Sequence, residues 1–227
     1  MSKVKQPRER QPSVGYLELL RGNRSFRFLW LGQVVSQMGD WFDTIAVYTI
    51  TLQLTGSSRS VALIMVARFL PSVVMGPLSG VVADRFSRRT IMITADLLRA
   101  VVVLGFLFVR RPDQMWLVYL LTVLQLAFST FFEPAKTAAI PSIVSDRELL
   151  PANAIAAVTW SVMLTLGAAI GGLVAGIFGT NAAFLLDSLT FVASASLILS
   201  VKMPKRVPRP KAKLTIGKAL GITDTIE

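Results

Sequence analysis

The chain has 227 residues, of which 53% are hydrophobic and only 16% are charged, whereas a soluble domain carries about 25% charged residues. This composition argues against a soluble globular protein and against a disordered chain. The chain contains no Cys and no His, which excludes disulfides and the usual zinc motifs. We therefore expect neither a metal nor a cofactor, and any proton relay must use carboxylates.

Six apolar runs follow one another along the chain, and each is long enough to cross a hydrocarbon core of about 30 Å as a helix. They cover residues 28–54, 60–83, 91–109, 115–132, 154–178 and 182–201. The runs do not alternate as barrel strands would. The expected fold class is an all-α membrane protein with six transmembrane helices. Residues 1–27 would form an N-terminal arm, 28–201 the helical bundle and 202–227 a basic tail.

The formal net charge of +11 has an uneven distribution that predicts the orientation in the membrane. Nineteen Lys and Arg residues fall in the arm, in residues 84–90, in residues 133–153 and in the tail, against three in the opposite loops. Because basic residues gather on the cytoplasmic side, both termini are predicted to be cytoplasmic in a cell membrane. The arm and tail are suited to contact anionic membrane lipid, and we expect no nucleic-acid partner.

Six ionisable residues lie well inside the predicted spans. If all of them faced lipid, the cost would be on the order of 15–20 kcal/mol, which exceeds the whole stability of a typical protein. They must therefore face the bundle interior, water or one another. The six are Asp40, Asp43, Arg68, Asp96, Arg99 and Asp187.

The first span carries a polar stripe at helical spacing, formed by Gln33, Gln37, Asp40 and Thr44. A stripe of this kind through an apolar helix is expected to line an aqueous cavity. Trp41 and Trp160 lie deeper in their spans than the other tryptophans, and they either line the same cavity or simply pack.

Depth in the membrane suggests which charges meet. Asp43 and Arg68 lie about 16 Å and about 12 Å from the outer ends of their spans, which predicts an ion pair that either serves transport or only fixes helix packing. Asp40 lies deeper, with no obvious cation at its level, and is the candidate carrier of a proton or cation. Asp96 and Arg99, three residues apart, are predicted to form a local structural ion pair. Asp187, near the outer end of the last span, is interpreted as structural.

Small residues and prolines in the spans predict how the helices pack and bend. Gly76 and Gly80, Gly167 and Gly171, and Gly172 and Gly176 are each four residues apart, a spacing that allows close helix approach. Pro71 and Pro77 are expected to kink or break the second span.

The turn between the second and third spans reads GVVADRFSRRT, residues 80–90. It resembles the cytoplasmic signature of the major facilitator superfamily, G-x-L-A-D-R-x-G-R-[RK], with Val82 in place of Leu and Ser87 in place of the second Gly. The matching residues are Gly80, Ala83, Asp84, Arg85, Arg88 and Arg89.

The resemblance extends along the chain. The first span, beginning FLWLGQVVSQMGDWFD, and the segment LLDSLTF are similar to the branch that contains macrolide-efflux and enterobactin-exporter proteins. The fifth span contains LGAAIGGL, which is similar to the antiporter signature, with Ala168 in place of Pro.

The resemblance implies a secondary transporter that works by alternating access. Complete members have twelve helices in two halves, each built as a 3+3 inverted repeat, so this chain would be one half. In such proteins Asp84 is expected to oppose the positive end of a helix in the other half, and Arg85 and Arg88 are expected to join a charge relay there.

The function predicted on this basis is proton-coupled efflux of drug-like or other amphipathic small molecules. The chain would be a truncated piece that needs its C-terminal half, or a half-size transporter that pairs with a second copy. The alternative is a non-transporting membrane remnant or assembly component. No enzyme is expected, because HExxH, G-x-S-x-G and the phosphate-binding P-loop are all missing from the sequence.

Overall fold

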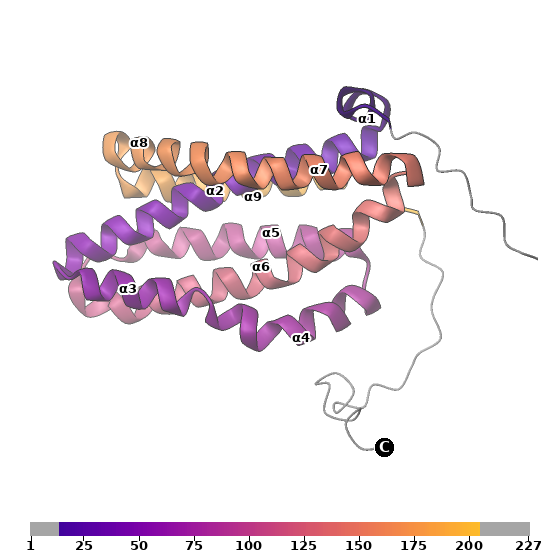
Figure 1. Ribbon diagram of the computed structural model, residues 1–227. Helices are drawn as coiled ribbons and strands as arrows, with labels where there is room; N and C mark the ends of the chain where they lie inside the picture. The colour runs from indigo at the N-terminus through magenta and orange to yellow at the C-terminus, as the bar shows by residue number, and fades with distance from the viewer. Residues whose placement is uncertain (1–13, 205–227) are drawn as a thin grey trace, which may run out of the picture.

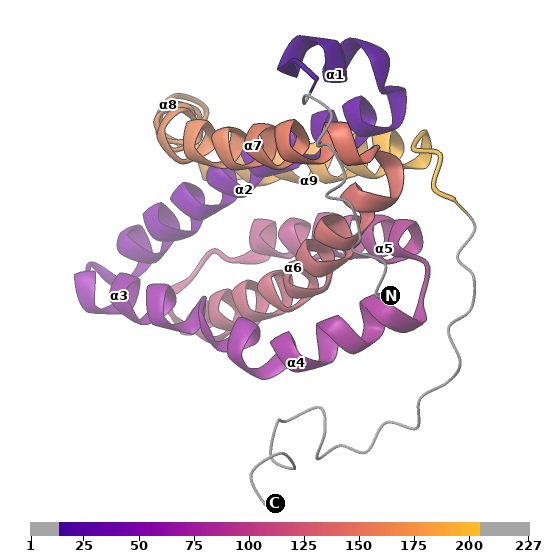
Figure 2. The ribbon, with the colours of Figure 1, turned by 45° about the vertical axis from the view of Figure 1, so that its right-hand side comes forward.

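The computed structural model describes residues 14–204, and regular structure in that range is entirely helical. The helices lie in two layers, with α2, α7, α8 and α9 in one and α3, α4, α5 and α6 in the other (Figures 1 and 2). Their bounds are α1 Tyr16–Gly22, α2 Arg24–Thr55, α3 Ser58–Ala67, α4 Leu70–Arg85, α5 Arg88–Gly105, α6 Met115–Ile143, α7 Asp146–Val162, α8 Ala168–Phe178 and α9 Thr180–Leu199.

Five helical segments in the described range are long and apolar enough to cross a membrane, which agrees with a multi-pass membrane protein. They are Ser58–Arg85, Arg88–Phe108, Pro112–Ile143, Asp146–Phe178 and Thr180–Leu199. Many of their large apolar side chains are exposed, as lipid contact requires. Helix α2 has 32 residues but is not among the five, since it holds the polar stripe.

The second predicted span is broken into α3 and α4 at Arg68 and Phe69. Pro71 lies at the start of α4, and its ring would clash with the carbonyl group four residues earlier in a continuous helix. The predicted break is therefore confirmed. Pro77, in contrast, lies inside α4 without ending it.

The predicted loop over residues 133–153 is wrong. Helix α6 continues to Ile143 and α7 begins at Asp146, so that only two residues separate them. Ser145 starts the new helix, because its backbone N–H donates to Glu148 Oε2 at 2.8 Å. This stretch lies between two of the predicted apolar runs, yet it is helical, and Glu133 and Lys136 pair along the helix with Nζ 2.7 Å from Oε2.

The start of the chain is also more helical than expected. Helix α2 begins at Arg24, and the short helix α1 precedes it with Leu19 buried. Asn23 accepts a hydrogen bond from the backbone N–H of Phe26 at 3.0 Å and donates to the Ile143 carbonyl at 2.8 Å, which ties α2 to the end of α6. The rest of the predicted arm, and the predicted tail from residue 205, lie outside the described residues.

Two apolar clusters fill opposite ends of the bundle, one around Leu29 and Met92 and the other around Val47 and Phe184. Helix α2 packs along α9, while α5 packs against both α6 and α9. Between the clusters lies a charged layer, which we define as Asp40, Asp43, Arg68, Asp96, Arg99 and Asp187. On α5, for example, Asp96 and Arg99 fall between Ala95 of the first cluster and Ala100 of the second.

Glycines allow α2 to approach α8 and α9 closely. Gly39 faces α9 so closely that a Cβ atom there would collide with Thr190 Oγ1 and Asp187 Oδ1. A Cβ atom on Gly171 of α8 would lie 2.9 Å from the Trp41 carbonyl oxygen, and one on Gly167 would collide with the Trp41 side chain. Small-residue packing is thus confirmed for Gly167 and Gly171. A Cβ atom on any of the other four predicted glycines, Gly76, Gly80, Gly172 and Gly176, would meet nothing within 4 Å in the described chain.

We expect Gly39→Ala to lower the free energy of unfolding by about 1–3 kcal/mol, because the added methyl group forces α2 and α9 apart. The thermal midpoint of the detergent-solubilised protein measures this change. Gly22→Ala is the control, since a Cβ atom on Gly22 meets nothing within 4 Å. An unchanged midpoint for Gly39→Ala would mean that this contact is loose.

Candidate transport site

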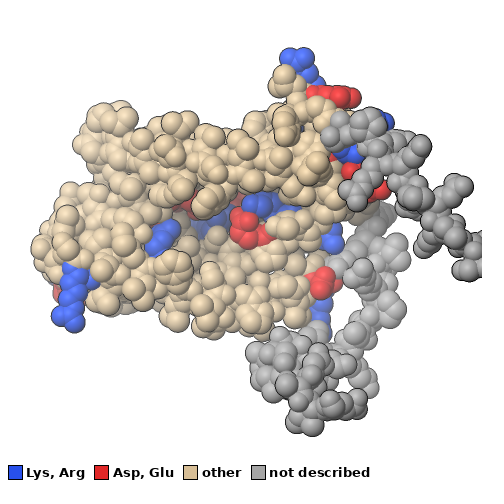
Figure 3. Space-filling model, viewed as in Figure 1, with Lys and Arg blue, Asp and Glu red and all other residues tan. Residues whose placement is uncertain are grey.

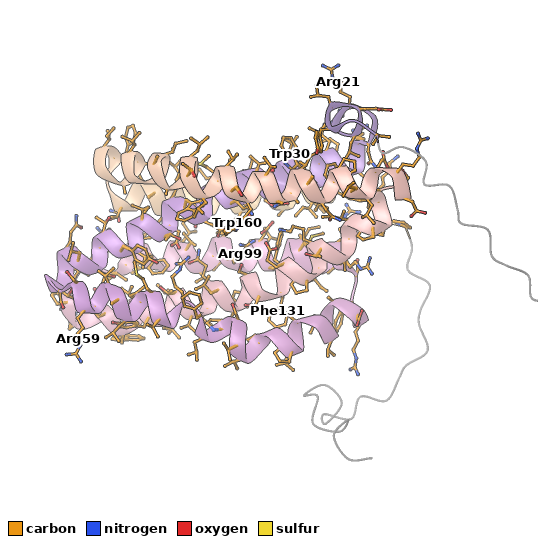
Figure 4. The ribbon with its side chains drawn as sticks, viewed as in Figure 1. Arg21, Trp30, Arg59, Arg99, Phe131 and Trp160 are labelled. Atoms are coloured by element: carbon orange, nitrogen blue, oxygen red, sulfur yellow. The ribbon has the colours of Figure 1, made fainter. Side chains whose placement is uncertain are left out.

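A hollow lies between the two layers of helices, and blue and red side chains are visible in it between tan surfaces (Figure 3). Arg99 of the charged layer lies between the helices of the two layers (Figure 4). The side chains of the charged layer come from α2, α5, α9 and the break between α3 and α4.

Arg99 holds two carboxylates at once. Its guanidinium group hydrogen-bonds Asp96 on its own helix, and its Nη1 lies 3.5 Å from Asp40 Oδ1 on α2. The prediction that Asp40 has no cation at its level is therefore wrong. Helix α5 begins at Arg88 rather than Ile91, so Arg99 lies deeper than expected, and its long side chain spans the gap to α2.

Two aromatic rings fix the same guanidinium group. The Arg99 Cζ atom lies 4.2 Å from the ring centroid of Phe191 on α9 and 5.0 Å from that of Phe132 on α6. Ring faces attract a cation most strongly where water is excluded, and Arg99 is only 2% exposed. Arg99 therefore links α2, α5, α6 and α9, a role that its three-residue spacing from Asp96 did not indicate.

Arg68, at the end of α3, and Asp43, on α2, form a long ion pair. Arg68 Nη1 lies 4.0 Å from Asp43 Oδ2, and Arg68 Nη2 donates a hydrogen bond to Thr44 Oγ1 at 2.9 Å. Asp43 is buried, and within the described chain neither of its carboxylate oxygens has a hydrogen-bond partner. The break before Pro71 places Arg68 where it can reach α2.

The predicted polar stripe is only partly open. Asp40 has a side chain 37% exposed, while Gln37 is half-buried. Gln33 and Thr44 at the two ends of the stripe are buried by neighbouring helices. Asp40 and Gln37 are therefore the residues of the stripe that keep exposed surface.

The two candidate tryptophans differ in environment. Trp41 packs against Gly167 and Gly171, where the chain makes a single π-helical turn between α7 and α8. Trp160 on α7 is 60% exposed. Trp41 thus contributes to packing of α2 on α8, and Trp160 offers an apolar surface.

The turn between α4 and α5 holds the ends of two other helices. The guanidinium group of Arg88 donates to the Ala138 carbonyl of α6, and that of Arg89 donates to the Leu199 carbonyl of α9. Leu199 is the last residue of α9, where carbonyl groups are unpaired and a cation is favoured, whereas Ala138 lies inside the last two turns of α6. Asp84 and Arg85 are exposed beside this turn, and Gly80 faces open space.

Sequence reasoning missed Lys136. This lysine is buried on α6 and paired with Glu133, and both charges act electrostatically on Asp40. The three-residue spacing of Glu133 and Lys136 was the available signal, but both residues lie outside the predicted apolar runs. Among residues 14–204, no three acidic side chains come together as a metal site would require.

Comparison with known proteins identifies the family. Residues 20–222 match the family described as transmembrane secretion effectors of the major facilitator superfamily. The chain belongs to this family. The predicted membership of the superfamily, in its efflux branch, is confirmed.

Several transporters of this superfamily are similar to the chain. It is 29% identical over 210 residues to the uncharacterized MFS-type transporter YfiS of Bacillus subtilis strain 168, covering 92% of this chain and 49% of that protein. It is 27% identical over 184 residues to macrolide efflux protein A of Streptococcus pyogenes, covering 79% and 45%. It is 28% identical over 177 residues to the putative bacilysin exporter BacE of Bacillus subtilis strain 168, covering 78% and 44%.

These similarities place the chain in the major facilitator superfamily. The chain spans about half the length of the relatives that it matches. No solved structure matches it.

Proposed function

We propose that this protein exports drug-like or other amphipathic small molecules by alternating access, driven by protons that bind at Asp40. The observation that carries the proposal is the geometry of Asp40, which is partly exposed in the hollow and lies 3.5 Å from the buried cation of Arg99. Relatives named as a macrolide efflux protein and a putative bacilysin exporter support export as the direction.

The proposed coupling step exchanges an ion pair for a neutral acid. When a proton reaches Asp40, the carboxylate becomes neutral and its attraction to Arg99 falls, while Asp96 keeps the guanidinium group compensated. Helix α2 is then held less tightly against α5. A proton that moves down a membrane potential of 100 mV supplies about 2.3 kcal/mol, enough to shift a balanced two-state equilibrium.

The proposed topology places α2 across the membrane beside the five apolar segments, which gives six spans and a 3+3 repeat. Its charges then face the hollow and not lipid. The end that carries Arg85, Arg88, Arg89 and Arg147 would be cytoplasmic, as would both termini in the cell membrane. Membrane lipid and a small-molecule substrate are the partners of this arrangement.

We expect Asp84→Asn to impair export while the protein still inserts and binds its partners. The charged form of Asp84 would stabilise one transport state by facing the positive end of a helix in a second half. Export from cells and protein in the membrane fraction are measured together. In a non-transporting assembly component the pattern is reversed, with partner binding lost, and that result would contradict the proposal.

The second half is also part of the proposal. Coverage of about half of each relative supports a chain that works with a C-terminal half, either on the same polypeptide or as a second copy. An antibody against the basic arm measures the size of the natural protein in its membrane. A band near twice 24.8 kDa indicates one longer polypeptide. A band near 24.8 kDa requires a paired half, and an active single copy of that size would contradict the need for a second half.

A further inference from the structure

Asp187 is a buried carboxyl group that the proposed coupling step does not use. It lies on α9 with an exposed fraction of 0%. Among residues 14–204, no Lys or Arg approaches it within ion-pair distance, and its Oδ2 atom has no hydrogen-bond partner. A carboxylate left in this environment would carry an uncompensated buried charge, which is strongly unfavourable.

The surrounding charges make that environment unfavourable for a second anion. Asp43 and Asp40 on α2 repel a charge on Asp187, and only Arg99 on α5 attracts it. Arg99 is already held by Asp40 and Asp96. Helix α8, which also packs against α9, contains no charged residue. The charged layer therefore holds four carboxyl groups and two guanidinium groups, Arg68 and Arg99.

The hydroxyl group of Thr190 gives the Asp187 carboxyl group only a weak hydrogen bond. Its hydroxyl oxygen lies 2.7 Å from the backbone carbonyl of Asp187 and 3.3 Å from Asp187 Oδ1. A hydroxyl group has one proton to donate, and the shorter contact takes it. The contact from the Thr190 hydroxyl group to Asp187 Oδ1 is therefore at most the weaker part of a shared hydrogen bond. Because Oδ2 has no partner among the described residues, this contact does little to stabilise a buried carboxylate.

We propose that Asp187 is a second proton-binding site of this transporter, neutral in the conformation described here and able to release its proton only when α2 and α9 separate. Gly39 supplies the link, because its backbone lies against Asp187 Oδ1 and Thr190 Oγ1 so closely that even a methyl group would not fit. Water needed to stabilise the carboxylate has no room there until the helices part. This inference rests on the proposed function for its role in transport.

The protonation state is tested by infrared spectroscopy on the natural protein in detergent at neutral pH. Asp187→Asn is expected to remove one band from the carbonyl region of neutral carboxylic acids. Asp146→Asn, at an exposed aspartate, is expected to leave that region unchanged. If Asp187→Asn removes no such band, the inference is overturned, whatever the export activity shows.

A second variant covers the case in which Asp187→Asn does not fold. Thr190→Val removes the hydroxyl group that donates to Asp187 Oδ1 at 3.3 Å, so the neutral-acid band is expected to shift while it remains present. No shift would overturn the inference. Export measurements distinguish failure of the proposed function from failure of this inference. If Asp40→Asn leaves efflux intact but the Asp187 band is present, the proposed function fails and the second proton site stands.

Discussion

Asp40→Asn is expected to reduce export to background while the protein still inserts into the membrane. The amide group has nearly the shape of the protonated acid but cannot lose a proton. The ion pair between residue 40 on α2 and Arg99 therefore cannot form again. The fold survives, because Asp96 still compensates the buried guanidinium group. The measurements are efflux of a fluorescent amphipathic compound from cells and the quantity of protein in the membrane fraction.

A matched control separates loss of coupling from loss of charge in general. Asp113→Asn neutralises an exposed carboxylate whose partner, Arg111, is equally exposed at 3.1 Å. We expect normal efflux in this variant, since exposed ion pairs contribute little. If Asp40→Asn exported as well as the control, Asp40 would have no part in the mechanism.

Arg99→Met is expected to destabilise the folded protein by about 3–5 kcal/mol, because it leaves Asp96 and Asp40 without their shared cation. The uncompensated charge of Asp96 accounts for most of the lost stability, since Asp96 is fully buried and Asp40 is not. The favourable contacts of the guanidinium group with Phe132 and Phe191 are lost as well. The thermal midpoint and the monodispersity of the purified protein measure the effect.

The double variant Asp96→Asn/Arg99→Met tests the reason for this loss. Removing both charges relieves the uncompensated carboxylate, so much of the stability is expected to return. Arg111→Met is the comparison for a surface guanidinium group, and it should change the midpoint little. A double variant no more stable than Arg99→Met alone would show that ring packing, and not charge compensation, dominates at Arg99.

Much of this protein follows from the sequence by itself. Runs of about twenty apolar residues can satisfy their backbone only as helices in lipid, and each run lies in helical structure, although α6 and α7 extend well beyond their runs. The break before Pro71 follows from the geometry of its ring. The turn sequence from Gly80 to Arg89 predicts the superfamily, which the family match confirms.

The tertiary structure decided which charges meet. Asp40 and Arg99 are 59 positions apart in the sequence. Their contact depends on where α2 and α5 begin and on the reach of the arginine side chain. The spacing of residues along a single helix predicts neither. Residues 133–143 became helix because packing and the pairing of Glu133 with Lys136 outweighed local proline signals. Burial of Asp187 behind Gly39 likewise exists only when α2 lies against α9, because close approach of two helices is a property of their paired surfaces and not of either sequence alone.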